Sequence, residues 1–186
     1  MPELNNRKFS HLKIHSQYSI CEGAIKIESL KDFCKENKIA SIGISDTSNL
    51  CGALEFAENI SKVGTQPIIG TQIYFNFEDT VGLLPLIALN EKGYKRIIEL
   101  SSRSYLENDA LSDPHLDIKE LLLDTDGVIL LSGTIQGLFG KLFKKGRLDE
   151  ISKLYKNLLS KFNDRFYLEI QRHGDQNEIA FEKFNP

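Results

Sequence analysis

Four side chains in this sequence have the chemistry to hold a divalent metal ion, and they are His15, Glu22, Asp46 and His173. Neutral imidazole nitrogens and ionised carboxylates bind divalent ions at about 2.0 to 2.3 Å, and a bound ion activates water against a phosphate ester. These four residues lie far apart in the sequence, so only a fold that gathers strand ends could bring them together. The set predicts a site that holds one ion and belongs to the metal-assisted phosphoesterase type.

The same residues are too few for a two-metal hydrolytic site, which needs bridging carboxylates and more imidazoles. Lys13 lies two residues before His15 on the same face of a predicted strand, where its ammonium group would replace or repel a cation. Simpler roles also remain open. His15 and His173 could each hydrogen-bond a loop carbonyl, and Asp46 could cap a helix that begins nearby.

The elements that must position these residues follow from the pattern of apolar residues. Short apolar runs alternate with amphipathic stretches about six times, which is typical of βα units around a mostly parallel sheet. Strands are predicted at residues 9–15, 40–45, 66–77, 83–89, 127–131 and 165–170. Helices are predicted at residues 27–37, 49–63, 92–107, 117–123 and 148–162, with a helical fragment at 184–186. Residues 78–82 and 108–115 are predicted to be surface loops.

Composition indicates an ordinary folded domain. The chain has 186 residues, of which 41% are hydrophobic and 26% charged, so it can bury a core without disulfides or a structural metal. Its three cysteines are odd in number and lack CxxC spacing, which argues against a disulfide framework or a zinc ribbon. No signal peptide or membrane-spanning stretch is evident, and we expect a cytoplasmic protein with no membrane partner.

The overall charge does not favour a nucleic-acid backbone as the main ligand of this chain. The formal net charge is −3 and the isoelectric point is about 5.8. The best candidate for a local basic patch is formed by Lys141, Lys144, Lys145 and Arg147. The alternative interpretation of these four cations is a solvated helix end.

Several motifs resemble one known family. The segment 9–24, FSHLKIHSQYSICEGA, is similar to the first motif of the PHP domain at the start of bacterial replicative polymerases, the DNA polymerase III alpha subunits. The segment 44–56, ISDTSNLCGALEF, resembles the second motif, and residues 127–133 and 164–174 continue the similarity in order. The resemblance covers nearly the whole chain, and the polymerase-type motifs distinguish it from free-standing PHP phosphatases.

The chain departs from the family's metal-binding pattern at several positions. Lys13 stands where the first histidine of a His-x-His pair is expected, Glu22 replaces an aspartate, and Thr47 replaces a histidine. Gln72 replaces a carboxylate, and Thr134 replaces a cysteine or polar ligand. Of the expected ligands, His15, Asp46 and His173 remain. The resemblance therefore implies a degenerate metal site without catalytic residues.

The resemblance also implies a fold and a role. The family fold is a distorted (β/α)7 TIM-like barrel, and we expect this α/β chain, residues 1–186, to supply about six strands, with the C-terminal part of the domain missing. The parent would be a DNA-directed DNA polymerase that uses Mg²⁺ and binds DNA outside this segment. The segment itself would need no cofactor and would act as a scaffold and docking surface for a proofreading exonuclease subunit, beside other replicase subunits.

Two alternatives remain. One is an active PHP metallophosphoesterase resembling histidinol phosphatase, which would hold Zn²⁺ or Mn²⁺. The other is a small βα protein with an unrelated ligand.

Overall fold

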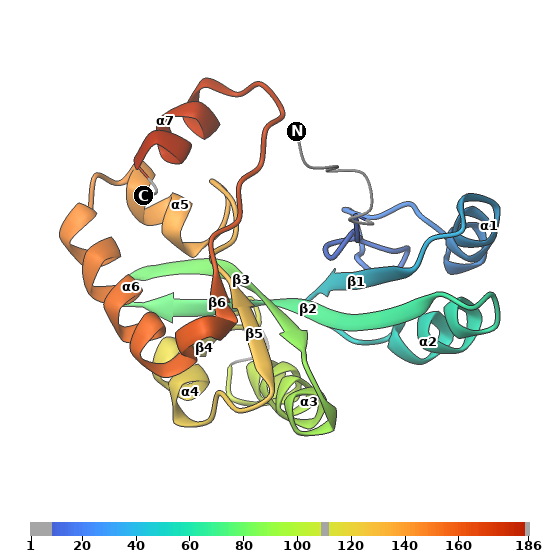
Figure 1. Ribbon diagram of the computed structural model, residues 1–186. Coiled ribbons are helices and arrows are strands. Elements are labelled where there is room, and N and C mark those ends of the chain that lie inside the picture. The colour runs from blue at the N-terminus through green and yellow to red at the C-terminus, as the bar shows by residue number, and fades with distance from the viewer. Residues whose placement is uncertain (1–8, 109–111, 185–186) are drawn as a thin grey trace. The chain divides into compact units, whose positions relative to one another are not determined.

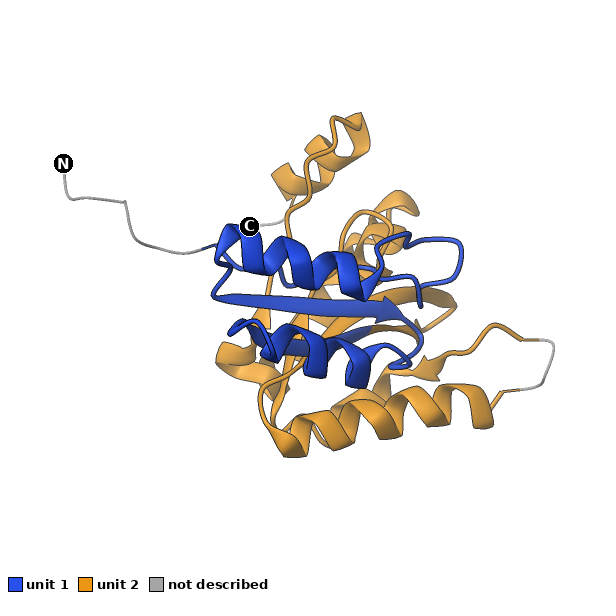
Figure 2. Ribbon diagram, turned by 90° about the vertical axis from the view of Figure 1, so that its right-hand side faces the viewer, with its two compact units in different colours: residues 1–71 blue, residues 72–186 orange. Residues whose placement is uncertain are grey.

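The computed structural model describes residues 9–108 and 112–184. The chain divides into two compact units, Met1–Thr71 and Gln72–Pro186, which Figure 2 shows in blue and orange. Each unit has its own core, and the functional residues of each are considered separately below. The sequence predictions for residues 109–111 and 185–186 lie outside the described residues.

Unit 1 consists of two helices and a short sheet (Figure 1). Its elements are α1 (Ile27–Asn37), β1 (Ser41–Thr47), α2 (Ala53–Ser61) and the first part of β2 (Gln66–Phe77). The core of unit 1 is formed by the buried faces of the two helices, which include Leu30 and Phe56, together with Ile42 and Ile44 of β1. The apolar residues of α1 recur at helical spacing, and this helix has the predicted bounds.

The predicted first strand, residues 9–15, is shorter than expected. It is reduced to an isolated parallel bridge between Ile14 and Ile44, supported by backbone hydrogen bonds from Ser45 to Ile14 and from Gly43 to His11. This pairing nevertheless places His15 and the loop that follows it beside the end of β1. The helix predicted at 49–63 begins only at Ala53, because residues 49–52 are held in a loop.

Unit 2 contains the remaining elements. They are the rest of β2, β3 (Thr80–Ala88), α3 (Glu91–Leu106), β4 (Leu116–Asp117), α4 (Ile118–Leu123), β5 (Val128–Leu131), α5 (Leu138–Lys144), α6 (Leu148–Phe162), a 3-10 turn (Asn163–Arg165), β6 (Phe166–Tyr167) and α7 (Gln176–Phe184). Helix α6 has the predicted bounds, whereas α7 extends over more residues than the predicted helical fragment. Among the described residues, no helix has the length and apolarity needed to cross a membrane.

The strands pair in the order β1-β2-β3-β5-β6, with β4 beside β2, and form an open sheet of six strands. This confirms the predicted α/β class; five of the six strands correspond to predicted ones, and β4 takes the place of the strand predicted at residues 9–15 in the count. Strands β5 and β6 are parallel, whereas β3 and β5 are antiparallel and pair Leu86 with Leu130. The predicted mostly parallel sheet is therefore interrupted at β3, which runs antiparallel to β5. Asn90, after β3, caps α3 by accepting a hydrogen bond from Gly93 N.

β3 runs antiparallel because of a tight turn at residues 78–79, which lie within the surface loop predicted at residues 78–82. Only Glu78 and Asp79 separate β2 from β3, and the two strands follow one another as a hairpin. Parallel strands need a crossover of a dozen residues or more, so two residues permit only an antiparallel return. The tip of this hairpin (Figure 1) lies beside α6, where Lys153 Nζ is 2.8 Å from Glu78 Oε1.

The ion pairs at this turn predict a pH dependence of stability. A hydrogen bond from Arg147 lowers the pKa of Asp79, and one from Lys153 lowers the pKa of Glu78. Groups with a lowered folded pKa add stability above their unfolded pKa, about 4, and lose it as the pH falls through the folded pKa. We therefore expect the melting temperature of the unmodified chain to exceed that of a Glu78→Gln/Asp79→Asn variant at pH 7. The difference should shrink below about pH 4, and a pH-independent difference would contradict this assignment.

Candidate functional site

The polar centre of unit 1 is the carboxylate of Asp46 at the end of β1. Its residue is 2% exposed. Ser16 donates to this carboxylate twice, from its backbone N (2.6 Å) and its Oγ (2.7 Å). Ser19 Oγ donates a third hydrogen bond at 2.8 Å. Because both serines are also buried, three protein donors occupy a group that the sequence suggested as a metal ligand or a helix cap. The cap interpretation is wrong, since α2 begins seven residues later behind Gly52.

Ser19 and Thr47 connect the other unit 1 candidates to Asp46. Ser19 Oγ accepts from Thr47 N at 3.1 Å and lies 3.4 Å from His15 Nδ1. Thr47 Oγ1 donates to Glu22 Oε2, which lies 3.9 Å from His15 Nδ1. The structure thus brings His15, Glu22, Asp46 and Thr47 together within one unit. The hydroxyl of Thr47, in the position where the family pattern has a histidine, contacts a carboxylate.

Close backbone contacts hold the loop 16–23 in place over β1. A Cβ atom on Gly23 would lie 2.1 Å from the carbonyl oxygen of Ser16, so only glycine allows the loop to close here. Tyr18 anchors the middle of the loop, because its hydroxyl donates to Glu55 Oε2 at 2.7 Å and its carbonyl accepts from Asn49 Nδ2. The hydrogen bond to Glu55 raises the pKa of Tyr18.

The unit 2 candidates occupy different elements. Gln72 is buried in β2. Thr134 follows β5, is 7% exposed, and its Oγ1 accepts from Gln136 N at 3.3 Å. His173 precedes α7, where its backbone N donates to Glu178 Oε2 at 2.7 Å and its Nδ1 lies 3.1 Å from Glu178 Oε1. These contacts lower the pKa of Glu178. They also connect His173 to the first turn of α7, where Glu178 lies.

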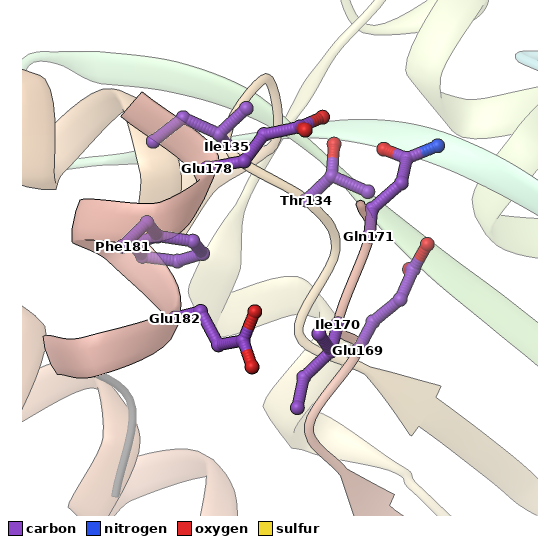
Figure 3. Close-up of a pocket in the computed structure, with 8 residues that line it drawn as sticks. All are labelled: Thr134, Ile135, Glu169, Ile170, Gln171, Glu178, Phe181 and Glu182. Atoms are coloured by element: carbon purple, nitrogen blue, oxygen red, sulfur yellow. The ribbon is translucent and has the colours of Figure 1, made fainter. Parts of the chain in front are cut away.

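A small pocket lies between α7 and the segment that follows β6 (Figure 3). Its lining residues are Thr134, Ile135, Glu169, Ile170, Gln171, Glu178, Phe181 and Glu182. The free volume is about 10 Å³, which is room for about one water molecule. Glu178 and Glu182 are already bonded to His173 and Arg172. The pocket is therefore too small for a phosphate ester.

The donor set in unit 1 does not fit a polynuclear metal centre. Asp46 already accepts three hydrogen bonds from Ser16 and Ser19, and Glu22 accepts from Thr47. Within residues 9–108 and 112–184 no group of three or more His, Cys, Asp or Glu side chains has a metal-binding arrangement.

Sequence reasoning did not assign the role of Ser19. The signal was present as two serines three residues apart, Ser16 and Ser19, after a predicted strand. It could not be interpreted because Asp46 lies 27 residues from Ser19 and is brought to it only by the pairing of Ile14 with Ile44.

The basic residues of the predicted patch also have specific contacts. Lys145 and Arg147 bond to Thr80, and Lys141 bonds to the carbonyl of Val81. Lys144 instead reaches Gln136. Lys141 and Lys144 lie in the last turn of α5 and Lys145 is its C-cap, and Lys144 and Lys145 are exposed, so these residues lie at a helix end as the alternative interpretation expected.

Comparisons with known proteins agree with this architecture. The family model described as "PHP domain" matches residues 11–173. The chain is 36% identical to the DNA polymerase III subunit alpha of Caulobacter vibrioides, covering 98% of this chain and 17% of that protein. It is 35% identical to the Rickettsia felis subunit and 34% identical to the Helicobacter pylori subunit, covering 89% and 91% of this chain and 14% and 15% of those proteins. The chain thus spans less than a fifth of the length of these relatives.

A solved structure shares the fold at low sequence identity. It is a Bifidobacterium adolescentis protein described as a candidate metal-dependent phosphoesterase, with a TM-score of 0.58 and 12% identity. The match covers 93% of this chain and 82% of that protein. With the matched family model and the polymerase relatives, these findings establish that the chain belongs to the PHP domain family and is similar to bacterial DNA polymerase III alpha subunits.

Proposed function

We propose that this chain is the N-terminal PHP domain of a cytoplasmic DNA polymerase III alpha subunit and serves there as a scaffold without phosphoesterase activity. The observation that carries the proposal is the carboxylate of Asp46, which accepts hydrogen bonds from Ser16 and Ser19. A metal ligand needs lone pairs that are free to face the ion. Here three of the roughly four lone-pair positions of the carboxylate accept hydrogen bonds that hold the loop 16–23 against β1, so the polar cluster stabilises the domain.

The parent polypeptide would then be a DNA-directed DNA polymerase, with the chemistry of nucleotidyl transfer and its Mg²⁺ outside this segment. The identity of 34 to 36% to alpha subunits over about nine-tenths or more of the chain supports this assignment. The proposed partners are a proofreading exonuclease subunit and other replicase subunits. Among the degenerate positions, Lys13, Thr47, Gln72 and Thr134 would serve as structural residues.

A second candidate function is an active metallophosphoesterase with Zn²⁺ or Mn²⁺. The observation in its favour is the approach of His15 Nδ1 to Glu22 Oε2, at 3.9 Å, which brings two possible ligands together. His173 is the further imidazole of the predicted ligand set, and the contact of its Nδ1 with Glu178 Oε1 at 3.1 Å is of the kind that orients a histidine whose other ring nitrogen binds a metal.

Metal content separates the two functions. After dialysis against Zn²⁺ or Mn²⁺, the scaffold function predicts well under one bound ion per chain and no hydrolysis of p-nitrophenyl phosphate. His15→Ala should leave the metal content and the rate of hydrolysis unchanged. The matched control, His11→Ala, should do the same, because the ring of His11 contacts Phe9 rather than the polar residues around Asp46. If two or three ions were bound, and were lost in His15→Ala but retained in His11→Ala, the scaffold function would be wrong and the metallophosphoesterase function would be right.

The docking role has a direct binding test. Size-exclusion chromatography of this chain with the purified proofreading exonuclease subunit of the same organism should give a complex. Two separate peaks at about 50 μM of each protein, where a complex with a dissociation constant of about 1 μM would be mostly formed, would count against docking to this segment.

A further inference from the structure

The turn between β2 and β3 has an unusual composition for its conformation. Two-residue hairpin turns favour Asn-Gly or Asp-Gly, since their residues adopt positive φ angles. Here the two residues are Glu78 and Asp79, and Glu78 has a φ of 55°. A glutamate in the left-handed region is disfavoured by contact of its Cβ with the backbone. The ion pairs of Asp79 with Arg147 and of Glu78 with Lys153 can offset this cost.

Both carboxylates face cations from α6 and from the connection before it. Asp79 binds Arg147 and lies 3.9 Å from Lys145 Nζ. Glu78 binds Lys153 at 2.8 Å. Asp79 remains 70% exposed, so its carboxylate can leave these cations without unfolding of the hairpin.

Uncharged oxygen atoms accept hydrogen bonds from Lys145, Arg147 and the nearby Lys141, and these bonds do not neutralise the positive charges. Lys145 Nζ donates to Thr80 Oγ1 at 2.8 Å, and Arg147 Nη1 donates to the same oxygen at 3.2 Å. Lys141 Nζ donates to the carbonyl oxygen of Val81 at 2.8 Å and lies 5.7 Å from the ring centroid of Tyr74. Thr80 is 2% exposed, so its hydroxyl oxygen is held in one position, where it accepts from both Lys145 and Arg147. These hydrogen bonds would remain if the carboxylate of Asp79 moved away.

A guanidinium and an ammonium held around one position are the usual protein ligands of phosphate oxygens. Near this position, Glu150 is the further carboxylate that contacts Arg147, at 3.0 Å from its Nε. Exposed ion pairs are weak, so a group with higher negative charge can displace the carboxylate of Asp79. We propose that Lys145 and Arg147 form a phosphate-binding cradle and that Asp79 occupies it as an internal anion.

The test uses the full chain with inorganic phosphate as the probe. In Asp79→Asn, phosphate should bind at least about tenfold more tightly than in the unmodified chain, since a competing charge has been removed. Binding is measured from backbone amide shifts of Thr80, Lys145 and Gly146 in nitrogen-15 NMR spectra, at an ionic strength held constant with chloride. Adding Arg147→Gln to Asp79→Asn should abolish the gain.

Asp32→Asn is the matched control, because it removes one exposed acid from α1 in unit 1 and changes the net charge equally. Equal phosphate affinity in Asp79→Asn and Asp32→Asn would overturn the proposal. If Asp79→Asn does not fold, the unmodified chain decides the matter. Because Asp79 competes for the cradle there, phosphate is added up to the highest concentration that the constant ionic strength allows. The Arg147 side-chain resonance should then shift with phosphate and not with chloride, and no shift at that concentration would overturn the proposal.

The source of the phosphate is distinguished by a second probe, a single-stranded thymidine oligonucleotide of about 20 nucleotides. Binding of the oligonucleotide to Asp79→Asn, with an affinity that falls as salt rises, together with weak binding of inorganic phosphate would assign the cradle to a polynucleotide backbone. Comparable binding of inorganic phosphate would assign it to a small phosphate compound. Failure of both probes would overturn the cradle itself.

Discussion

The Asp46→Ala variant is expected to lower the free energy of unfolding by about 3 kcal/mol. The substitution removes the acceptor of three hydrogen bonds and leaves the donors of Ser16 and Ser19 buried without it. Each buried donor that loses its partner costs about 1 to 3 kcal/mol, and part of this cost is relieved when the loop moves. Urea unfolding of the 186-residue chain, followed by circular dichroism, measures the difference.

Two variants show whether the effect comes from the hydrogen bonds. Asp46→Asn keeps one acceptor oxygen for Ser16 N, so we expect a smaller loss than for alanine. Ser19→Ala removes the donor to Asp46 together with the acceptor of Thr47 N, and should cost about 1 to 2 kcal/mol. If Asp46→Ala changed stability by less than about 0.5 kcal/mol, the level of an ordinary surface substitution, the structural role of this carboxylate would have to be abandoned.

The second large effect is expected in unit 2, from Gly93→Ala. Gly93 lies in the first turn of α3, where a Cβ atom would be 1.7 Å from the carbonyl oxygen of Gly127. Gly127 has a φ of 71° and receives the backbone hydrogen bond of Leu89, so it cannot retreat without disturbing the start of β5. Alanine is favoured over glycine by about 1 kcal/mol in a helix, but the clash requires movement of backbone on both sides.

We therefore expect Gly93→Ala to lose about 3 kcal/mol or more, a size reserved for strain or core disruption. Thermal and urea unfolding measure the loss. Lys95→Ala, at an exposed position of the same helix, is the control and should stay within about 0.5 kcal/mol of the unmodified chain. A Gly93→Ala variant more stable than the unmodified chain would mean that helix propensity outweighs the contact with Gly127.

These two sites also show how far sequence reasoning reaches. Helices α1 and α6 have the predicted bounds, and so does β2, because the apolar residues that define each one recur within a single element. The family motifs around His15 and Asp46 likewise depend on neighbours in the chain. Local periodicity and local motifs were therefore sufficient to predict the α/β class, five of the six strands and the PHP resemblance, which the family match confirms.

The partners of the polar residues were decided by the tertiary structure. Asp46 meets Ser16 across 30 residues, and Arg147 meets Thr80 across 67, distances over which no spacing rule applies. Two turn residues, Glu78 and Asp79, reverse the chain between β2 and β3, so that β3 runs antiparallel to β5 in a sheet predicted to be mostly parallel. The sequence by itself determined which residues are polar at strand ends and which family they resemble. The fold decided that Asp46 holds a loop, because burial beside Ser16 and Ser19 leaves its carboxylate surrounded by donors.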